Sequence, residues 1–464
     1  MESINRREFL MGSALAVAAT ATGATSSSPS PSPSSSPSPS PAPSPSVPLI
    51  ATAPVLQNAA ETSIGVSFAV TADASGWVEY STSPDLKDAT KVFSGAHGLM
   101  TVDDKVALVR LTGLKPATKY YYRIGADRIS FKGGYAMKNL GPEVDAKIHS
   151  FTTLGAAATG SFCVINDTHD SKPALGYTLA KVAELKPAVV LWNGDASNTS
   201  ETLDVAIGIF LKTHKDHPEY AADTPYMFLN GNHDFRGRFN RKLGELMMFR
   251  EPTERKGEYA ELGRNFVQRL GDIALIGLDT GEDKLDTNPK FAGLFKMKPY
   301  RELQTRWLAE ALETPAVKTA KFRVAFCHIP LFDPRPDANP GDIAPADSDP
   351  RYSANFAYWQ RTCANMWSPL FKKAGVQLVI VAHEHCFRYD APTADRTWTQ
   401  IVGGGPVLGE RTKWNEDGTV TKTKTPHLFP TVIEGKVVGG KLVIDVHNAF
   451  LGTVAGHYEF PPVG

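Results

Sequence analysis

The sequence has few cysteines and no excess of charge of either sign. Only four cysteines occur in 464 residues, at spacings that match no thiolate zinc site, so neither a disulfide framework nor a cysteine-rich metal site is expected. Lysine and arginine together number 49, as do aspartate and glutamate, which leaves a formal net charge of zero. A neutral chain gives no electrostatic reason to expect nucleic acid or an anionic membrane surface as a partner. A basic binding groove is therefore disfavoured.

The chain also lacks an apolar run long enough to span a bilayer. Its N-terminal apolar run is short, rich in alanine and preceded by Arg6 and Arg7 in the stretch "RREFL". Together with an AxA-like cleavage site at residues 19–21, this run resembles a twin-arginine export signal. We therefore expect residues 1–25 to be a signal peptide and the mature protein to be periplasmic, cell-surface or extracellular. A short buried or membrane-spanning helix is the less favoured alternative.

Two changes of composition follow the expected signal. Residues 26–48 consist almost wholly of proline and serine, and because they offer almost no apolar side chain to bury, we expect a disordered spacer. Residues 49–154 contain short segments in which polar and apolar residues alternate, which predicts an antiparallel β-sandwich. Within them, the stretch "LTGLKPATKYYYRI" resembles a segment of fibronectin type III-like domains. The matching residues are Leu114, Pro116, Thr118, Tyr120, Tyr122 and Ile124.

Strand and helix patterns alternate from residue 157 to about residue 450. Strands are expected in "SFCVIND", "AVVLWNGD", "PYMFLNGNHD", "FRVAFCHIP" and "LVIVAHEHC". Helices are expected in "PALGYTLAKVAEL", "SETLDVAIGIFLKTH", "ELQTRWLAEAL" and "SPLFKKAG". This alternation implies a parallel or mixed sheet, so the polar residues at the strand ends collect on one edge, where open α/β sheets place their ligands.

Histidines and carboxylates are concentrated at these expected strand ends. The residues are His169, His233, His328, His383 and His385, which are five of the twelve histidines, with Asp167, Asp195 and Asn232. Imidazole and carboxylate together suit Mn, Fe, Zn or Ni, whereas calcium and magnesium prefer oxygen ligands. Because there are more candidate ligands than one ion uses, we expect two divalent ions. Alternate residues of a strand share a face, so His383 and His385 should both face the site, one at each ion.

The ordered motifs "DTH", "GD", "GNHD", "CH" and "AHEH" resemble those of the calcineurin-like metallophosphoesterases. For residues 157–450 the resemblance implies an α/β fold in which a β-sandwich is flanked by helices (α/β/β/α). The fibronectin type III-like sandwich would precede it. The residues implied to hold the two ions are Asp167, His169 and His385 for the first, Asn232, His328 and His383 for the second, and Asp195 as the bridge.

The same resemblance implies roles for two residues beside these ligands, and two arginines that closely follow "GNHD" are further candidates. His233 would stabilise the transferring phosphoryl group or protonate the leaving oxygen, and Asp234 would orient its ring, although a helix N-cap is the alternative for Asp234. Water between two metal ions loses a proton near neutral pH, so the implied reaction is in-line attack of hydroxide on a phosphate ester. Arg236 and Arg238 could reach a substrate phosphate, with solvated surface arginines as the alternative.

Two departures from the family pattern matter. Ala382 stands where the family usually has glycine, and its methyl group is tolerated if the backbone there is not at positive φ. Purple acid phosphatases have glycine where this chain has His169, and a tyrosine where it has Asn198. Without that tyrosine, an iron charge-transfer site is not supported, and histidine-type phosphoesterases are the nearer relatives.

Two further segments are weaker candidates. The glycines of "IVGGGP" (401–406) could bring backbone amides to a phosphate or could simply form a tight turn. The long insertion at 331–352 contains Arg335 and Arg351 and has the length of a lid that could govern selectivity.

The sequence thus predicts an exported, metal-dependent phosphoric ester hydrolase with two transition-metal ions and a small phosphate mono- or diester as substrate. A purple acid phosphatase is one alternative. A non-catalytic cell-surface binding protein, with the phosphoesterase part as a scaffold, is the other. A degenerate scaffold would have lost ligands, whereas this sequence keeps all of them.

Overall fold

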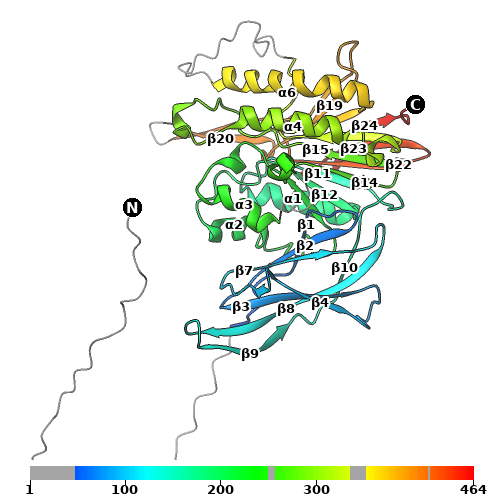
Figure 1. Ribbon diagram of the computed structural model, residues 1–464. Coiled ribbons are helices and arrows are strands. Elements are labelled where there is room, and N and C mark those ends of the chain that lie inside the picture. The colour runs from blue at the N-terminus through cyan, green and yellow to red at the C-terminus, as the bar shows by residue number, and fades with distance from the viewer. Residues whose placement is uncertain (1–46, 249–256, 335–351, 416–418) are drawn as a thin grey trace, which may run out of the picture. The chain divides into compact units, whose positions relative to one another are not determined.

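A computed structural model describes residues 47–248, 257–334, 352–415 and 419–464 (Figure 1). The expected signal peptide and nearly all of the expected spacer lie outside these residues, as do Arg335 and Arg351. Within the described part of the chain, no helix has both the length and the apolarity needed to cross a membrane.

The first sheet has nine strands. In spatial order they are β24 (Thr453–Phe460), β23 (Lys441–Asn448), β22 (Thr431–Val438), β11 (Phe162–Ile165), β12 (Val189–Asn193), β13 (Tyr226–Leu229), β1 (Val55–Gln57), β2 (Ser63–Ala69) and β7 (Val106–Thr112). Strands β11, β12 and β13 run parallel, and all their residues are buried. Parallel strands covered on both faces are apolar throughout, which explains the runs "FCVI", "VVLW" and "YMFL".

The second sheet has six strands. In spatial order they are β14 (Phe266–Leu270), β15 (Ile273–Gly277), β16 (Phe322–Phe326), β17 (Leu378–Val381), β19 (Thr399–Val402) and β18 (Arg388–Asp390). The strands from β15 to β19 in this order are parallel, so the segments that follow them leave the sheet at the same edge.

Helices cover the outer face of each sheet. They are α1 (Lys172–Leu185), α2 (Leu203–Phe210), α3 (Leu243–Met247), α4 (Met297–Ala311), α5 (Pro315–Lys318) and α6 (Tyr352–Ala374). Leu179 of α1 and Phe210 of α2 share a buried cluster with Trp192 of the first sheet. Leu308 of α4 and Trp367 of α6 belong to the buried cluster on the second sheet, and both helices lie at the top of Figure 1. This arrangement confirms the expected α/β/β/α architecture.

The inner faces of the two sheets pack against each other. Phe162 of β11 and Phe326 of β16 meet edge to face, with ring centroids 5.4 Å apart. Both are fully buried, in a cluster that also contains Leu191 and Ile380. Full burial of such side chains contributes about 1.5–3 kcal/mol each. This packing fixes the carboxyl-terminal edges of the two sheets relative to each other.

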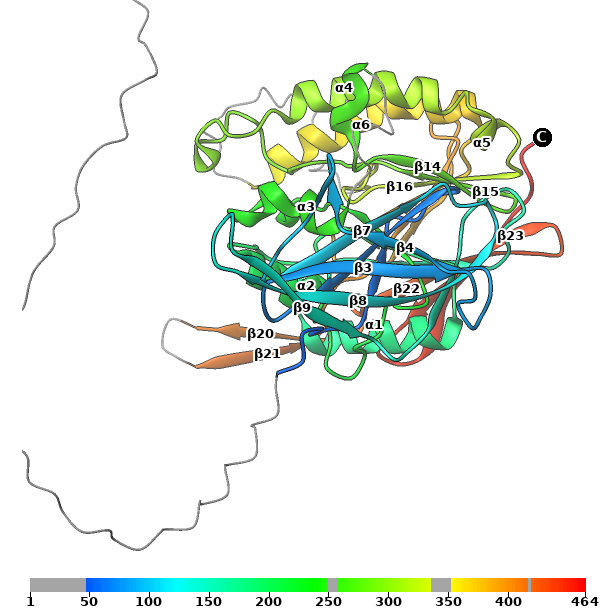
Figure 2. The same ribbon diagram turned by 60° about the horizontal axis from the view of Figure 1, so that its bottom comes forward.

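A second β-sandwich lies at the N-terminal side. Its separate sheet consists of β10 (His149–Thr152), β8 (Lys119–Phe131), β3 (Ala74–Ser81) and β4 (Thr90–Phe93), with β9 (Met137–Val144) paired to β8. This sheet comes toward the viewer in Figure 2 and packs on β2 and β7 through Phe68, Tyr122 and Phe151. Two small hairpins complete the described strands: β5 (Gly95–Ala96) with β6 (Leu99–Met100), and β20 (Glu410–Trp414) with β21 (Val420–Lys424). The expected N-terminal sandwich is confirmed, while its fibronectin type III-like character stays a prediction.

The two sandwiches share one sheet. Strand β1 pairs in parallel with β13, with Gln57 opposite Tyr226, and so β1, β2 and β7 extend the first sheet. The Asn58 amide adds a hydrogen bond to the Tyr226 carbonyl oxygen. The alternation within residues 49–154 does not indicate this pairing, because the edge of β13 forms only when the α/β part folds. The boundaries at 49–154 and 157–450 stay predictions.

A buried hydroxyl also links the two parts. Tyr122 donates to the Ala222 carbonyl oxygen at 2.6 Å, and both residues are buried. We expect Tyr122→Phe to lower the free energy of unfolding by about 1–3 kcal/mol, because it leaves a buried carbonyl without its donor. Tyr121→Phe, on the opposite face of β8, is the matched control and should change it by less than about 0.5 kcal/mol. Urea denaturation would contradict this if both variants were equally stable.

Candidate metal centre

Residues that follow the parallel strands of both sheets come together at one edge. Asp167, Asp195 and Asn232 follow β11, β12 and β13 of the first sheet. His328 and the segment 383–385 follow β16 and β17 of the second sheet. The structure gathers the carboxylates and imidazoles into two clusters that share Asp195.

The first cluster contains Asp167, His169, Asp195 and His385. His169 Nε2 lies 3.4 Å from Asp195 Oδ2 and 2.9 Å from His385 Nε2. His385 Nε2 lies 3.4 Å from Asp167 Oδ1. Both aspartates are buried and both histidines are partly exposed. Donor atoms from three strand ends thus converge on one small volume.

The second cluster contains Asp195, His328 and His383. His328 Nε2 lies 3.2 Å from Asp195 Oδ2, the same oxygen that faces His169. Asn232 joins this cluster, since its Oδ1 lies 2.8 Å from His383 Nδ1. All seven residues predicted to hold metal are therefore near one another, and Asp195 lies between the two clusters. Their role as ligands stays a prediction.

The hydrogen bonding of His328 shows that a cation fits here. Its Nδ1 lies 2.9 Å from the Asn193 carbonyl oxygen, which can only accept, so Nδ1 carries a proton. Its Nε2 faces the Asp195 carboxylate, yet neither this nitrogen nor Asp167 Oδ1 makes a hydrogen bond of normal geometry, although both atoms are buried. Buried electron-pair donors that face each other need positive charge between them, which a proton supplies in the metal-free protein and a metal ion would supply when bound.

The electrostatics of the clusters favour ionised carboxylates. Burial opposes ionisation of Asp195, but His328 outweighs it and lowers the pKa of Asp195 to about 2. Burial also opposes charge on His328, but Asp195 and Asp167 raise the pKa of His328 to about 10. Burial and the neighbouring His328 lower the pKa of His383 to about 4. A proton on His328 would have to leave when a metal binds, because only the neutral ring offers a lone pair.

Backbone amides orient the two central carboxylates. Asp167 Oδ2 accepts from the His383 amide at 2.9 Å and from the Asn166 side chain at 2.7 Å. Asp195 Oδ1 accepts from the His233 amide at 2.8 Å. Each carboxylate therefore uses one oxygen to hold a loop and turns the other toward the clusters.

Most of the candidate ligands have an unusual backbone conformation. Five of the seven lie in the left-handed region, with φ from 45° to 70°: Asp167, His169, Asp195, His383 and His385. Each such residue costs about 1–2 kcal/mol relative to the right-handed conformation. Strain of this kind persists where the surrounding structure enforces it, and it is frequent at functional sites.

The last histidine pair lies in a turn. His383 and His385 both face the site, one in each cluster, as predicted, but strand β17 ends at Val381, so the expected strand alternation is not what places them. Their left-handed backbone aims the two rings instead, and Gly405 leaves room beside them, because a Cβ there would lie 2.7 Å from the His385 Cβ. Ala382 is not among the described residues with positive φ, which confirms that its methyl group is tolerated.

Asp234 does not contact the ring of His233, so the prediction that it orients this ring is wrong. Neighbouring residues of a 3₁₀ turn point about 120° apart, and Asp234 faces inward from η1 (His233–Phe235). Its Oδ2 accepts from the amides of Asp195 at 2.7 Å and Gly231 at 2.8 Å. Burial, followed by the charge of Asp195, raises the pKa of Asp234 to about 7. Asp234 therefore braces the loop that carries Asp195.

In the sequence, Asn198 stands out only as a departure from the purple acid phosphatase pattern. Its Oδ1 lies 3.2 Å from His169 Nδ1, and its side-chain amide donates to the His169 carbonyl oxygen at 3.1 Å. Its own carbonyl oxygen lies 3.1 Å from His233 Nδ1. Asn198 thus orients two rings at once. No sequence motif marks it, because half of its action comes from the backbone.

The two arginines predicted to contact substrate differ in their surroundings. Arg236 forms ion pairs with Glu282 and Asp283, and its Nη1 lies 2.9 Å from His233 Nε2. Arg238 is exposed, and its amide donates to Glu201. The guanidinium group of Arg236 is therefore already bound by these neighbouring side chains, and a substrate-contact role fits Arg238 better.

The glycines after β19 serve packing. The Gly403 amide donates to the Val381 carbonyl oxygen, and the Gly404 amide donates to Thr431 Oγ1 at 2.9 Å. The Gly404 carbonyl oxygen accepts from the Asn166 side chain at 3.1 Å. These two amides are used within the fold, which favours the tight turn over a phosphate cradle.

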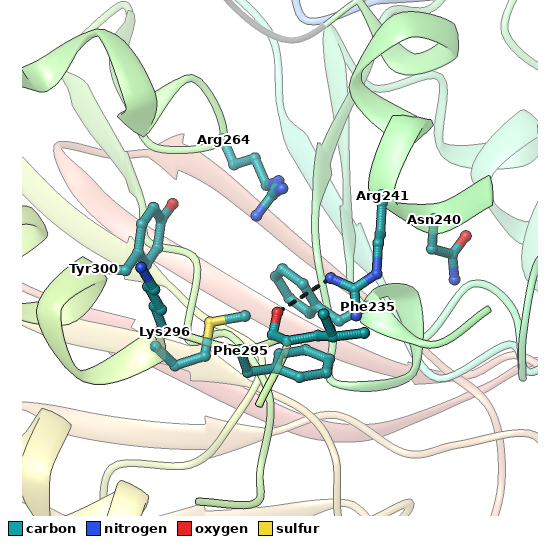
Figure 3. Close-up of a pocket in the computed structure, with 9 residues that line it drawn as sticks. Phe235, Asn240, Arg241, Arg264, Phe295, Lys296 and Tyr300 are labelled. Atoms are coloured by element: carbon teal, nitrogen blue, oxygen red, sulfur yellow. Dashed lines mark hydrogen bonds between the residues drawn. The ribbon is translucent and has the colours of Figure 1, made fainter. Parts of the chain in front are cut away.

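A basic cavity of about 220 Å³ lies beside the turn that carries His233 (Figure 3). Arg264 stacks on the ring of Phe235 at 4.8 Å, and Arg241 stacks on the ring of Phe295 at 5.0 Å. The remaining lining residues are Asn240, Leu294, Lys296, Met297 and Tyr300. Three cationic side chains thus line this cavity, and one of them, Arg264, is paired with Asp279 at 3.0 Å.

Comparison with protein families agrees with this architecture. Residues 160–387 match the calcineurin-like phosphoesterase family, and residues 53–153 match the N-terminal domain of purple acid phosphatases. The chain therefore carries a calcineurin-like phosphoesterase domain, which supports a phosphoester hydrolase. No curated protein matches the chain.

Solved structures share the fold at low sequence identity. A purple acid phosphatase, PPD1, from yellow lupin (Lupinus luteus) seeds is 14% identical, with a TM-score of 0.56 over 88% of this chain and 74% of its own. The structure of PhoD is 12% identical, with a TM-score of 0.55 over 89% of this chain and 92% of its own. At such identities the likeness establishes the fold alone.

Asn198 offers a test of the cluster geometry. We expect Asn198→Ala to weaken Mn or Zn binding by about 10- to 100-fold, because His169 loses the partner that orients its ring. Asn139→Ala, on the exposed surface of β9, is the matched control and should bind metal like the parent protein. Calorimetric titration of metal-free protein measures both affinities. Unchanged affinity in Asn198→Ala would contradict the orienting role.

Proposed function

We propose that this protein is an exported phosphoesterase that uses two divalent transition-metal ions to hydrolyse phosphate mono- or diesters. The observation that carries the proposal is the pair of clusters that share Asp195. Two such clusters match a two-metal site, in which both the attacking and the leaving oxygen are stabilised. The match of residues 160–387 to the phosphoesterase family supports the same reaction class.

The residues of the chain would divide the work as follows. Asp167, His169 and His385 would hold one ion, and Asn232, His328 and His383 the other, with Asp195 shared. When bound, the ions would supply Lewis-acid activation of water and neutralise charge on the phosphoryl group. His233, partly exposed beside Asp195, would contact the phosphoryl group, and burial lowers the pKa of this histidine, which favours its neutral form.

A purple acid phosphatase is the second candidate, favoured by the match of residues 53–153 to the N-terminal domain of that family. The position of Asn198 opposes it, because a side chain that holds His169 stands where those enzymes have a tyrosine ligand. Iron-loaded protein without a visible charge-transfer band would exclude this candidate.

Export rests on the twin-arginine-like stretch at residues 1–25, and loss of secretion in an Arg6→Lys, Arg7→Lys variant would test it.

A substrate panel tests the proposal. Metal-loaded protein should hydrolyse at least one phosphate mono- or diester, and Asp195→Ala should lower kcat/KM by at least about 100-fold, because both clusters lose their common carboxylate. Asp445→Ala, which removes the partner of the exposed His457, is the matched control. Metal analysis should find about two equivalents in the parent protein. An Asp195→Ala variant as active as the parent would refute the bridging role.

A non-catalytic scaffold would give a different result in the same experiment. It would bind less than one equivalent of Mn or Zn and hydrolyse no member of the panel. The convergence of all seven candidate ligands opposes this alternative, because without a ligand to bind, the strained backbone of five of them would bring no benefit.

A further inference from the structure

A buried ionic network lies behind His233. Arg236 donates from Nε to Glu282 Oε2 at 3.1 Å and from Nη2 to Glu282 Oε1 at 2.9 Å. The same Nη2 donates to Asp283 Oδ1 at 3.0 Å. Its Nη1 points the other way and lies 2.9 Å from His233 Nε2. The guanidinium group thus bridges two acidic residues and a candidate catalytic histidine.

The network is expensive to bury, so its placement needs an explanation. The side chains of Glu282 and Asp283 are 0% and 1% exposed, and that of Arg236 is 20% exposed. Burial, followed by the hydrogen bond with Asp283, raises the pKa of Glu282 to about 8, which shows what it costs to keep this acidic pair out of water. Apolar residues of similar size would fill the same space. Stability alone therefore does not account for this arrangement.

The acidic pair is held rigidly on the second sheet. Glu282 and Asp283 lie on the loop that follows β15, whereas Arg236 and His233 follow β13 of the first sheet. Arg301 of α4, fully buried, donates to the Glu282 carbonyl oxygen at 2.8 Å and so fixes the loop backbone. Lys284 pairs with Asp283 Oδ1 at 2.7 Å. The position of the guanidinium group is thus set from the opposite sheet.

Two separate contacts specify one form of the His233 ring. An arginine only donates, so Nε2 of His233 must accept the hydrogen bond from Arg236. A carbonyl oxygen only accepts, so Nδ1 must carry the proton that faces Asn198 at 3.1 Å. Both contacts are satisfied only by the neutral tautomer that is protonated at Nδ1. Neither contact involves Asp234.

We propose that Arg236, held by Glu282 and Asp283, is a positioning residue that fixes the orientation and the Nδ1-protonated tautomer of His233. The inference rests on the proposed function, in which His233 contacts the phosphoryl group. A lysine could not replace Arg236, because a single ammonium cannot engage both carboxylates in a fork and reach the ring as well. In this tautomer neither ring nitrogen has a proton available for the leaving oxygen, so Arg236 acts on the reaction by holding the ring of His233 in place and not by preparing it as an acid.

The first test reads the tautomer directly. Full-length protein labelled with ¹⁵N-histidine should show the Nε2 resonance of His233 at a shift typical of an unprotonated nitrogen, and His233→Gln assigns the resonance. In Arg236→Ala, Arg236→Lys and Glu282→Gln, we expect this resonance to move toward an average of the two tautomers. The exposed ion pair between Arg306 and Glu258 supplies the controls Arg306→Ala and Glu258→Gln, which should leave it in place. An unchanged resonance in all three network variants would overturn the proposal.

The second test uses kinetics and rescue. On any ester that the parent protein hydrolyses, Arg236→Ala and Glu282→Gln should lower kcat by about 10- to 100-fold with little change in KM. Added guanidinium ion should restore part of the activity of Arg236→Ala, which a general loss of structure would not allow. A loss in KM alone would instead make Arg236 a substrate contact and overturn the positioning role. Should the parent protein hydrolyse nothing, the proposed function fails, while the tautomer measurement still decides the role of Arg236.

Discussion

The structure depends on the burial of two carboxylates, Asp167 and Asp195, where the edges of two sheets meet. Burial raises the free energy of an ionised carboxylate unless positive charge or hydrogen bonds surround it. Here backbone amides satisfy one oxygen of each, and imidazoles converge on the other. This leaves an electron-rich centre that a divalent cation fits. The surrounding loops can be understood as the means of holding these two side chains in place.

That requirement explains why so many residues depart from ordinary backbone geometry. A parallel strand delivers its last residue at the sheet edge but cannot turn a side chain across it. A left-handed residue two positions after the strand makes this change of direction, as at Asp167, Asp195 and His383. The strain is tolerated because apolar residues between the sheets, such as Phe162 and Phe326, keep the two edges docked. Packing far from the site thus maintains its geometry.

The candidate site residues and their gathering at one sheet edge could be predicted from sequence, whereas the local geometry that aims each side chain could not. Metal chemistry restricts ligands to a few residue types, and α/β folds gather such residues at the ends of their strands. Asp167, Asp195 and His328 can therefore be recognised from the sequence alone. The role of Asp234 was predicted wrongly, because adjacent residues of a tight turn point in different directions.

Long-range contacts escaped prediction for a different reason. Asn198 acts partly through a backbone carbonyl, which every residue has, and so no residue type signals it. The pairing of Gln57 with Tyr226 joins strands that are far apart in sequence, and local alternation carries no information about such a partner. The α/β/β/α layers were predictable because each element encodes its own buried face.

The same long-range contacts make the centre a property of the whole fold. Each cluster takes side chains from both sheets, since His385 joins Asp167 and His328 joins Asp195. The contact between Arg236 and Glu282 crosses between the sheets in the same way. A cation that binds only the docked sheets would stabilise their docking by mass action, so metal occupancy and fold stability are coupled. Strand β1 also supports the centre, because it covers the free edge of β13, the strand that precedes Asn232 and His233 in the chain. The N-terminal sandwich therefore contributes to the centre without providing any of its ligands.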